Sequence, residues 1–154
     1  MRDRPSIYEF AGGAPAFLAL AGALNERCLA DPVLNHPFSH GGHPEHVARL
    51  AGYLGEVFGG PPTYTALGGH SAMLSIHART GADEDLADRF VVCFDQAVDD
   101  AQLPDDAVLR GALHDYMVWA TREVHQYAPP GSSVPRELVM PRWSWDGPVS
   151  SVVD

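Results

Sequence analysis

Histidine is the residue type in this chain whose number and placement could support chemistry. The 154 residues include eight histidines, and imidazole is a good ligand for zinc, copper and haem iron. Along the chain they are His36, His40, His43 and His46, then His70 and His77, and finally His114 and His125. The first four gather in one stretch, so the first question is whether that stretch binds a metal.

The group formed by His36, His40 and His43 has two interpretations. It could bind zinc or copper directly, but such sites usually add carboxylate or thiolate ligands at regular spacing. No Glu-x-x-His pair recurs on two helical segments, as a di-iron bundle would require. Ordinary solvated loop histidines are therefore the favoured interpretation.

Two other histidines lie in apolar surroundings. His46 stands one helical turn before Leu50, and His77 follows Leu74 and Ile76. A single histidine on an apolar face is more often a core residue than a ligand. Two that face each other across a pocket would justify assigning a ligand role.

Four stripes of apolar residues at helical spacing position these histidines. They run from Phe17 to about Pro32, from Pro44 to Phe58, from Asp83 to near Asp100, and from Pro104 to before Ala128. Between residues 63 and 81 the pattern is short and broken, which predicts a loop with a brief helix before His77. No segment alternates apolar and polar residues as a strand does. The chain is therefore predicted to be all-α.

The pattern changes near the end of the chain. Residues 131–154 contain prolines and no helical period, so we expect a helical domain over residues 1–130 and an extended tail over residues 131–154. Trp143 and Trp145 are costly to leave in water, which predicts that the tail packs on the helical body or on a second subunit.

Composition limits the partners of the protein. Twenty acidic against ten basic residues give a formal charge of −10, which repels nucleic-acid phosphates and anionic lipid surfaces. No apolar run reaches the ~18 residues of a membrane span, and no leader pattern is present. Cys28 and Cys93 belong to no Cys-x-x-Cys pair, so buried thiols are favoured over a disulfide. A soluble cytoplasmic protein without nucleic-acid or membrane partners is predicted.

Two glycine motifs and the segment around His77 resemble a known family. Gly12-Gly13 precedes the first long helix, Phe58-Gly59-Gly60-Pro61 ends the second, and the run Gly69-His70-Ser71-Ala72-Met73-Leu74-Ser75-Ile76-His77 carries the histidine. With these spacings, residues 12–127 resemble the truncated haemoglobins of group II. The resemblance implies a globin-like two-over-two helical sandwich around haem b, iron protoporphyrin IX.

The resemblance also implies roles for individual residues. His77 falls at the proximal iron ligand, Phe38 at the aromatic that packs on the haem, and Arg49 at a cation for a haem propionate. His46 falls at the distal position, one turn before the ceiling residue Leu50.

Further residues are expected around the cofactor. Apolar contacts are expected from Leu54, Met73 and Phe90. Tyr64 matches a family tyrosine near the haem edge, although a plain packing role is equally open.

Two positions depart from the group II pattern. Asn25 stands where the family usually has a ligand-facing tyrosine, and Phe90 replaces the characteristic tryptophan of the third helix. Hydrogen bonding to a bound ligand is then expected from His46, with Asn25 as a second candidate; alternatively, His46 itself binds iron when no ligand is present. A surface role for Asn25 and a plain core role for Phe90 stay open.

The function implied is a haem protein that binds dioxygen, carbon monoxide or nitric oxide. Nitric oxide dioxygenase or peroxidase-like turnover would need an electron source, and no Gly-x-Gly-x-x-Gly nucleotide motif follows a strand here, so a separate reductase would have to supply it. A homodimer is a further expectation. The rival hypothesis is a haem-free, globin-like sensor or interaction module that uses Trp143 and Trp145. Intact His77 and Phe38 favour the haem protein.

Overall fold

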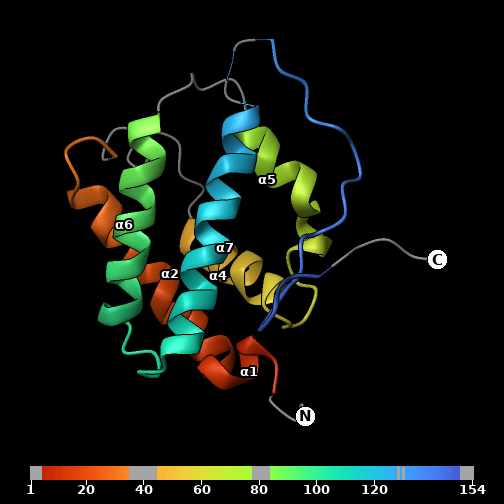
Figure 1. Ribbon diagram of the computed structural model, residues 1–154. Helices are drawn as coiled ribbons and strands as arrows, with labels where there is room; N and C mark the ends of the chain where they lie inside the picture. Colours follow the sequence, from red (N-terminus) through yellow and green to blue (C-terminus); the bar gives the residue numbers. More distant parts are fainter. Residues whose placement is uncertain (1–4, 35–44, 78–83, 128, 130, 150–154) are drawn as a thin grey trace.

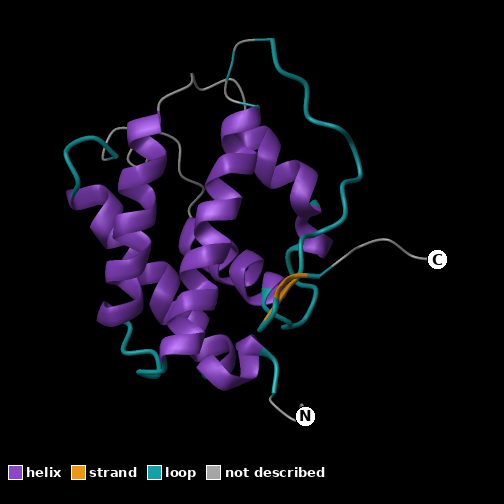
Figure 2. Ribbon diagram, viewed as in Figure 1, coloured by secondary structure: helices purple, strands orange, loops and turns teal. Residues whose placement is uncertain are grey.

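Helices dominate the computed structural model, which describes residues 5–34, 45–77, 84–127, 129 and 131–149 (Figure 1). The α-helices of this part are α1 (Ile7–Ala11), α2 (Gly13–Ala30), α4 (His46–Val57), α5 (Gly69–His77), α6 (Glu84–Asp100) and α7 (Ala107–Gln126). A 3-10 helix η1 spans Thr65–Leu67, and β1 (Trp143–Ser144) pairs antiparallel with β2 (Gly147–Pro148) (Figure 2). The predicted all-α fold is confirmed. No helix in the described ranges is long and apolar enough to cross a membrane.

Helix α2 lies at the centre of the helical packing. It contacts α1, α4 and α6, and α6 in turn packs antiparallel against α7 (Figure 1). Phe17, Leu20, Leu24 and Cys28 recur at helical spacing and are at most 1% exposed, so this face of α2 forms the middle of the core. The apolar stripe that predicted this helix is therefore its buried face.

The second glycine motif allows α1 to approach the end of α4. A Cβ atom at Gly60 would lie 2.7 Å from ring atoms of Tyr8, which is closer than real side chains come. The Tyr8 N–H donates to the Phe58 carbonyl at 2.9 Å. Glycine is required here because the aromatic ring of α1 occupies the space of a side chain.

Helix α7 begins later than the sequence pattern predicts. Pro104 was expected to open it, but the first helical residue is Ala107. The Asp106 side chain accepts the Leu109 N–H at 2.9 Å and is the N-cap. The Pro104 carbonyl accepts the Asp106 N–H at 2.9 Å. Pro104 therefore belongs to the turn that precedes the cap.

The C-terminal tail crosses the surface beside α5 and returns toward the start of the chain (Figure 1). The ring of Trp143 lies 5.5 Å from that of Tyr116 and 5.8 Å from that of Trp119, so it packs on α7. The indole N–H of Trp145 donates to the Pro5 carbonyl at 2.8 Å, and its ring contacts Phe10 edge to face at 5.2 Å. The two ends of the described chain are therefore in contact.

Candidate cofactor-binding site

Helix α5 carries the residue predicted as the proximal ligand. Gly68 and Gly69, with φ values of +121° and +72°, turn the chain from η1 into α5, because this region of backbone space favours glycine. His77 is the last residue of α5. Its side chain lies outside the described part of the structure, as does all of Phe38.

Helix α4 supplies residues predicted for the distal side. His46 is its first residue, and Leu50 stands one turn later. The His46 and Leu50 side chains are both partly buried, and the Nε2 atom of His46 is shielded from solvent. Leu54, a further turn along, is 1% exposed and belongs to the closed core. This face of α4 therefore runs from a partly open end at His46 to a closed end at Leu54.

Three other predicted residues lie at the margin of the core. Met73 on α5 and Phe90 on α6 are partly buried and pack against the core cluster. Asn25 on α2 is also partly buried. Asn25 therefore lies on the helix that packs against both α4 and α6. The predicted residues thus come from four helices, and these three stay outside the closed core.

Arg49 on α4 has a side chain with which an anionic group could pair. Its Nε atom is buried and has no hydrogen-bond partner among the described residues. A buried guanidinium nitrogen without a partner is costly. Next to it, Leu50 leaves apolar surface partly open. Haem is an apolar plane with carboxylates on one edge. Its plane would cover the exposed part of Leu50, and a carboxylate would pair with Arg49.

Tyr64 has contacts that explain its burial without a cofactor. It is 6% exposed, and its ring meets that of Tyr53 edge to face at 5.1 Å. Burial raises the pKa of its hydroxyl, while the charge of Arg49 acts in the opposite direction. Of the two roles open to Tyr64, packing is the one with contacts in the structure.

Comparison with models of known protein families assigns the chain to a family. A model of the bacterial-like globin family matches residues 6–121. The chain belongs to the bacterial-like globin family. Membership confirms the resemblance drawn from the glycine motifs and the His77 segment. It also implies a haem cofactor and diatomic gas ligands for this globin.

Solved haemoglobins share the fold of this globin. A thermostable haemoglobin from the actinobacterium Thermobifida fusca is 32% identical, with 86% of this chain and 100% of that chain covered and a TM-score of 0.65. A haemoglobin from the thermophilic phototrophic bacterium Chloroflexus aurantiacus is 27% identical over 79% and 98% of the two chains, with a TM-score of 0.68. The group II truncated haemoglobin of Bacillus anthracis, at 19% identity over 86% and 98% of the two chains, has a TM-score of 0.68 and shares the fold. No curated protein matches the chain.

Sequence reasoning missed the two buried polar side chains of the described core, Glu56 and His70. Glu56 accepts the backbone N–H groups of Tyr64 and Thr65 at 3.0 and 2.9 Å and also bonds the Thr65 hydroxyl. It thereby holds the turn that leads to α5 in this globin. The signal that was available is a charged residue inside the apolar run at the end of α4, beside Val57.

His70 joins three helices. Its Nδ1 atom lies 2.8 Å from the Tyr53 hydroxyl of α4, and its Nε2 atom lies 2.9 Å from a Glu123 carboxylate oxygen of α7. His70 is 3% exposed. Both ring nitrogens are engaged, so this histidine of α5 is not available as an iron ligand.

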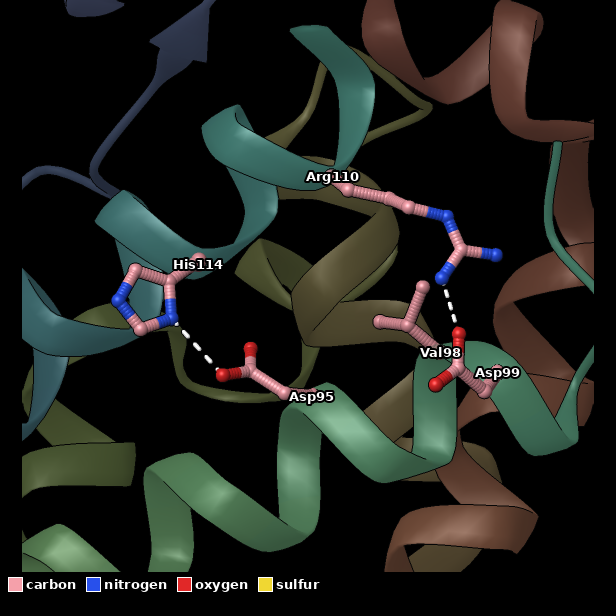
Figure 3. A pocket seen from close by; sticks show the side chains of 5 residues that line it. All are labelled: Asp95, Val98, Asp99, Arg110 and His114. Atoms are coloured by element: carbon pink, nitrogen blue, oxygen red, sulfur yellow. Dashed lines mark hydrogen bonds and ion pairs between the residues drawn. The ribbon is translucent and has the colours of Figure 1, made fainter. Parts of the chain in front are cut away.

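A hollow of about 270 Å³ between α6 and α7 lies elsewhere on the globin (Figure 3). Its charged side chains pair with one another across the two helices: Arg110 with Asp99, and His114 Nδ1 with Asp95 at 2.9 Å. Because these charged groups already pair with one another, we assign no ligand to the hollow. The His114 side chain is 46% exposed and lies at the surface.

The direct metal-binding interpretation has no support in the described part of this globin. No group of three histidine, cysteine, aspartate or glutamate residues there is arranged to hold a metal ion. His36, His40 and His43 lie outside the described residues. Cys28 and Cys93 are free and buried, as predicted.

Proposed function

We propose that this globin binds haem b with His77 as the proximal iron ligand and takes up a diatomic gas on the opposite side. The observation that carries the proposal is the buried Arg49 Nε atom, which has no hydrogen-bond partner among the described residues and belongs to the residue next to the partly buried Leu50 on α4. Haem would supply an iron with one free coordination position for the gas. The rival haem-free module would leave this nitrogen without a partner among the described residues.

The protein residues have separable tasks. Arg49 would pair with a haem propionate, and Leu50, Met73 and Phe90 would exclude water from the porphyrin. A buried ring nitrogen of His46 would donate to a partially negative gas ligand. Asn25, which is partly buried on α2, is the second candidate donor, and iron ligation by His46 in the unliganded protein is the alternative to donation.

The expected cellular location, oligomeric state and turnover have less structural support than haem binding. The free thiols of Cys28 and Cys93 support a reducing, cytoplasmic location. A homodimer, a separate reductase and turnover as a nitric oxide dioxygenase or peroxidase stay predictions.

The absorbance spectrum of the purified protein tests the proposal. A Soret band near ~400 nm that shifts on reduction and on addition of carbon monoxide is expected. His77→Ala should lose haem or retain it weakly while keeping its helical circular dichroism, because the proximal imidazole is the expected protein ligand of the iron. A protein that cannot be loaded with haem would support the haem-free module. An unchanged spectrum in His77→Ala would place the ligand elsewhere.

Stopped-flow kinetics separate the distal candidates. If His46 donates to dioxygen, His46→Leu should release it roughly ten- to a hundredfold faster, because a charge-assisted hydrogen bond contributes ~1.5–3 kcal/mol, and carbon monoxide should respond less. If His46 binds iron, the same variant should change a six-coordinate ferrous spectrum to a five-coordinate one. Fast release from Asn25→Leu and wild-type release from His46→Leu would make Asn25 the donor.

A further inference from the structure

The attachment of α5 to the rest of the molecule is unusual. Among the described elements, α5 has more than scattered backbone contact only with its sequence neighbour η1, whereas α2 packs along α1, α4 and α6. Leu74 is its one fully buried hydrophobic residue in the described part. Gly68, directly before α5, and Gly69, its first residue, both have positive φ, and glycines restrain the backbone poorly. Individual side chains must therefore contribute much of what fixes α5.

His70 occupies the position from which α5 can be fixed. It is buried, it stands in the first turn of α5, and its two ring nitrogens reach Tyr53 and Glu123 on two different helices. The ring also stacks on that of Tyr53, with 6.0 Å between centroids and an interplanar angle of 25°. One side chain therefore joins α5 to both α4 and α7.

The chemistry of the partners determines how the imidazole is held. Burial raises the pKa of Tyr53, with further contributions from Tyr116, so its hydroxyl keeps its proton. The Glu123 carboxylate accepts hydrogen bonds. The consistent assignment is that Nε2–H donates to Glu123 and Nδ1 accepts the proton of Tyr53. A flipped ring would present carbon atoms to both partners, so one orientation is favoured.

We propose that His70 is a positioning residue that anchors α5 between α4 and α7 and thereby sets where His77 is presented to the iron. The inference rests on the proposed function for its effect on iron ligation. His77 lies seven residues, close to two turns and about 10.5 Å of helix, beyond the anchor. A tilt about the glycine pair at the start of α5 would move the far end most. The anchor therefore restrains the end of the helix that bears the ligand.

Three variants test the anchor. His70→Leu removes both hydrogen bonds, while His70→Gln keeps one donor and one acceptor. His114→Leu is the matched control, because it removes a histidine–carboxylate pair of the same length between α6 and α7. Should His70→Leu fail to fold, Glu123→Ala removes one partner at a position that is 23% exposed.

The first measurement uses the protein loaded with haem. His70→Leu should shift or broaden the iron–histidine stretching band of the ferrous unliganded protein in resonance Raman spectra. It should also lose haem roughly tenfold faster, the low end of what supporting partners of a metal-bound histidine contribute. His70→Gln should recover most of both, and His114→Leu should match the wild type. A wild-type band together with haem loss within about twofold in His70→Leu would overturn the inference.

The second measurement needs no haem. In the haem-free protein, His70→Leu should speed amide hydrogen exchange in α5 while leaving exchange in α2 unchanged. Unchanged exchange in α5 would overturn the anchor. Absence of the iron–histidine band from the wild type would instead overturn His77 ligation, and the exchange result would still decide whether His70 fixes α5.

Discussion

The interface between α2 and α6 and the attachment of α5 are stabilised in opposite ways. At the first, Leu24, Cys28 and Phe94 are 0% exposed, and a bidentate ion pair joins Arg27 to Asp100 across the surface at 2.6 and 2.8 Å. Helix α5 buries Leu74 and packs Met73 against the core, and it otherwise depends on a few polar contacts, chiefly those of His70. Stability is therefore spread over many residues in one region and concentrated in single side chains in the other.

The largest effect is expected from a substitution in the core of the first region. Phe94→Ala should lower the free energy of unfolding by roughly 3–5 kcal/mol, because it removes a fully buried ring and leaves a cavity. Urea denaturation measures the change. Val92→Ala, on the same helix and 53% exposed, is the control and should cost far less. Equal losses in the two variants would contradict a core centred on this interface.

A smaller and more local effect is expected at α5. The Ser71 hydroxyl donates to the Pro135 carbonyl and accepts the Leu138 N–H, each at 2.8 Å. Ser71→Ala should cost about 1 kcal/mol or less but should speed trypsin cleavage at Arg136 several-fold, because it frees this stretch of the tail from α5.

A serine elsewhere in the tail is the control for that experiment. The Ser144 hydroxyl also makes two hydrogen bonds, to Gly147 and Asp146, but both lie within the turn between β1 and β2. Ser144→Ala should leave cleavage at Arg136 unchanged. Equal acceleration in both variants would mean that the tail opens as a whole and that Ser71 does not attach it to α5.

The smallest effect is expected from the surface ion pair of the first region. The hydrogen bond from Arg27 lowers the pKa of the Asp100 carboxyl. A carboxyl with a lowered pKa stabilises the folded state above its unfolded pKa, about 4, and this contribution is lost as the pH falls through the folded pKa. Arg27→Ala should therefore differ slightly from the wild type at pH 7 and by less at about pH 2, because the contribution made through Asp100 decreases as the pH falls. Urea midpoints at the two pH values check this.

An exposed arginine outside any such pair is the control for the pH experiment. Arg142 is exposed, and the described residues show no ion pair for it. Arg142→Ala should give the same difference from the wild type at both pH values. An Arg27→Ala curve that stays parallel to the wild-type curve down to low pH would show that the pair contributes nothing through Asp100.

The long helices could be predicted because burial imposes their period on the sequence. Phe17, Leu20 and Leu24 mark the buried face of α2 directly. The start of α7 was predicted wrongly because a proline fits both a non-helical turn and the first turn of a helix. The side-chain cap of Asp106 places the helix start at Ala107 instead. Local patterns therefore located the helices better than their ends.

Sequence reasoning predicted the candidate site less completely than it predicted the helices. Resemblance supplied His77 and Arg49, but it did not indicate that a buried nitrogen of Arg49 has no hydrogen-bond partner within the part of the chain that the structure describes. The three residues of the α5 anchor, Tyr53, His70 and Glu123, lie 17 and 53 positions apart. No local period relates such positions, and only the folded arrangement of α4, α5 and α7 brings them together.

The tryptophans have a consequence for optical measurements on this protein. The chain has three: Trp143 of β1 packs against Trp119 of α7, and Trp145 contacts Phe10 of α1. Intrinsic tryptophan fluorescence will therefore report on the packing of the tail against α7 and α1, and not on the interface of α2 and α6. A fluorescence transition that precedes the loss of helical circular dichroism would reveal a tail that detaches first, and coincident transitions would show a single cooperative unit.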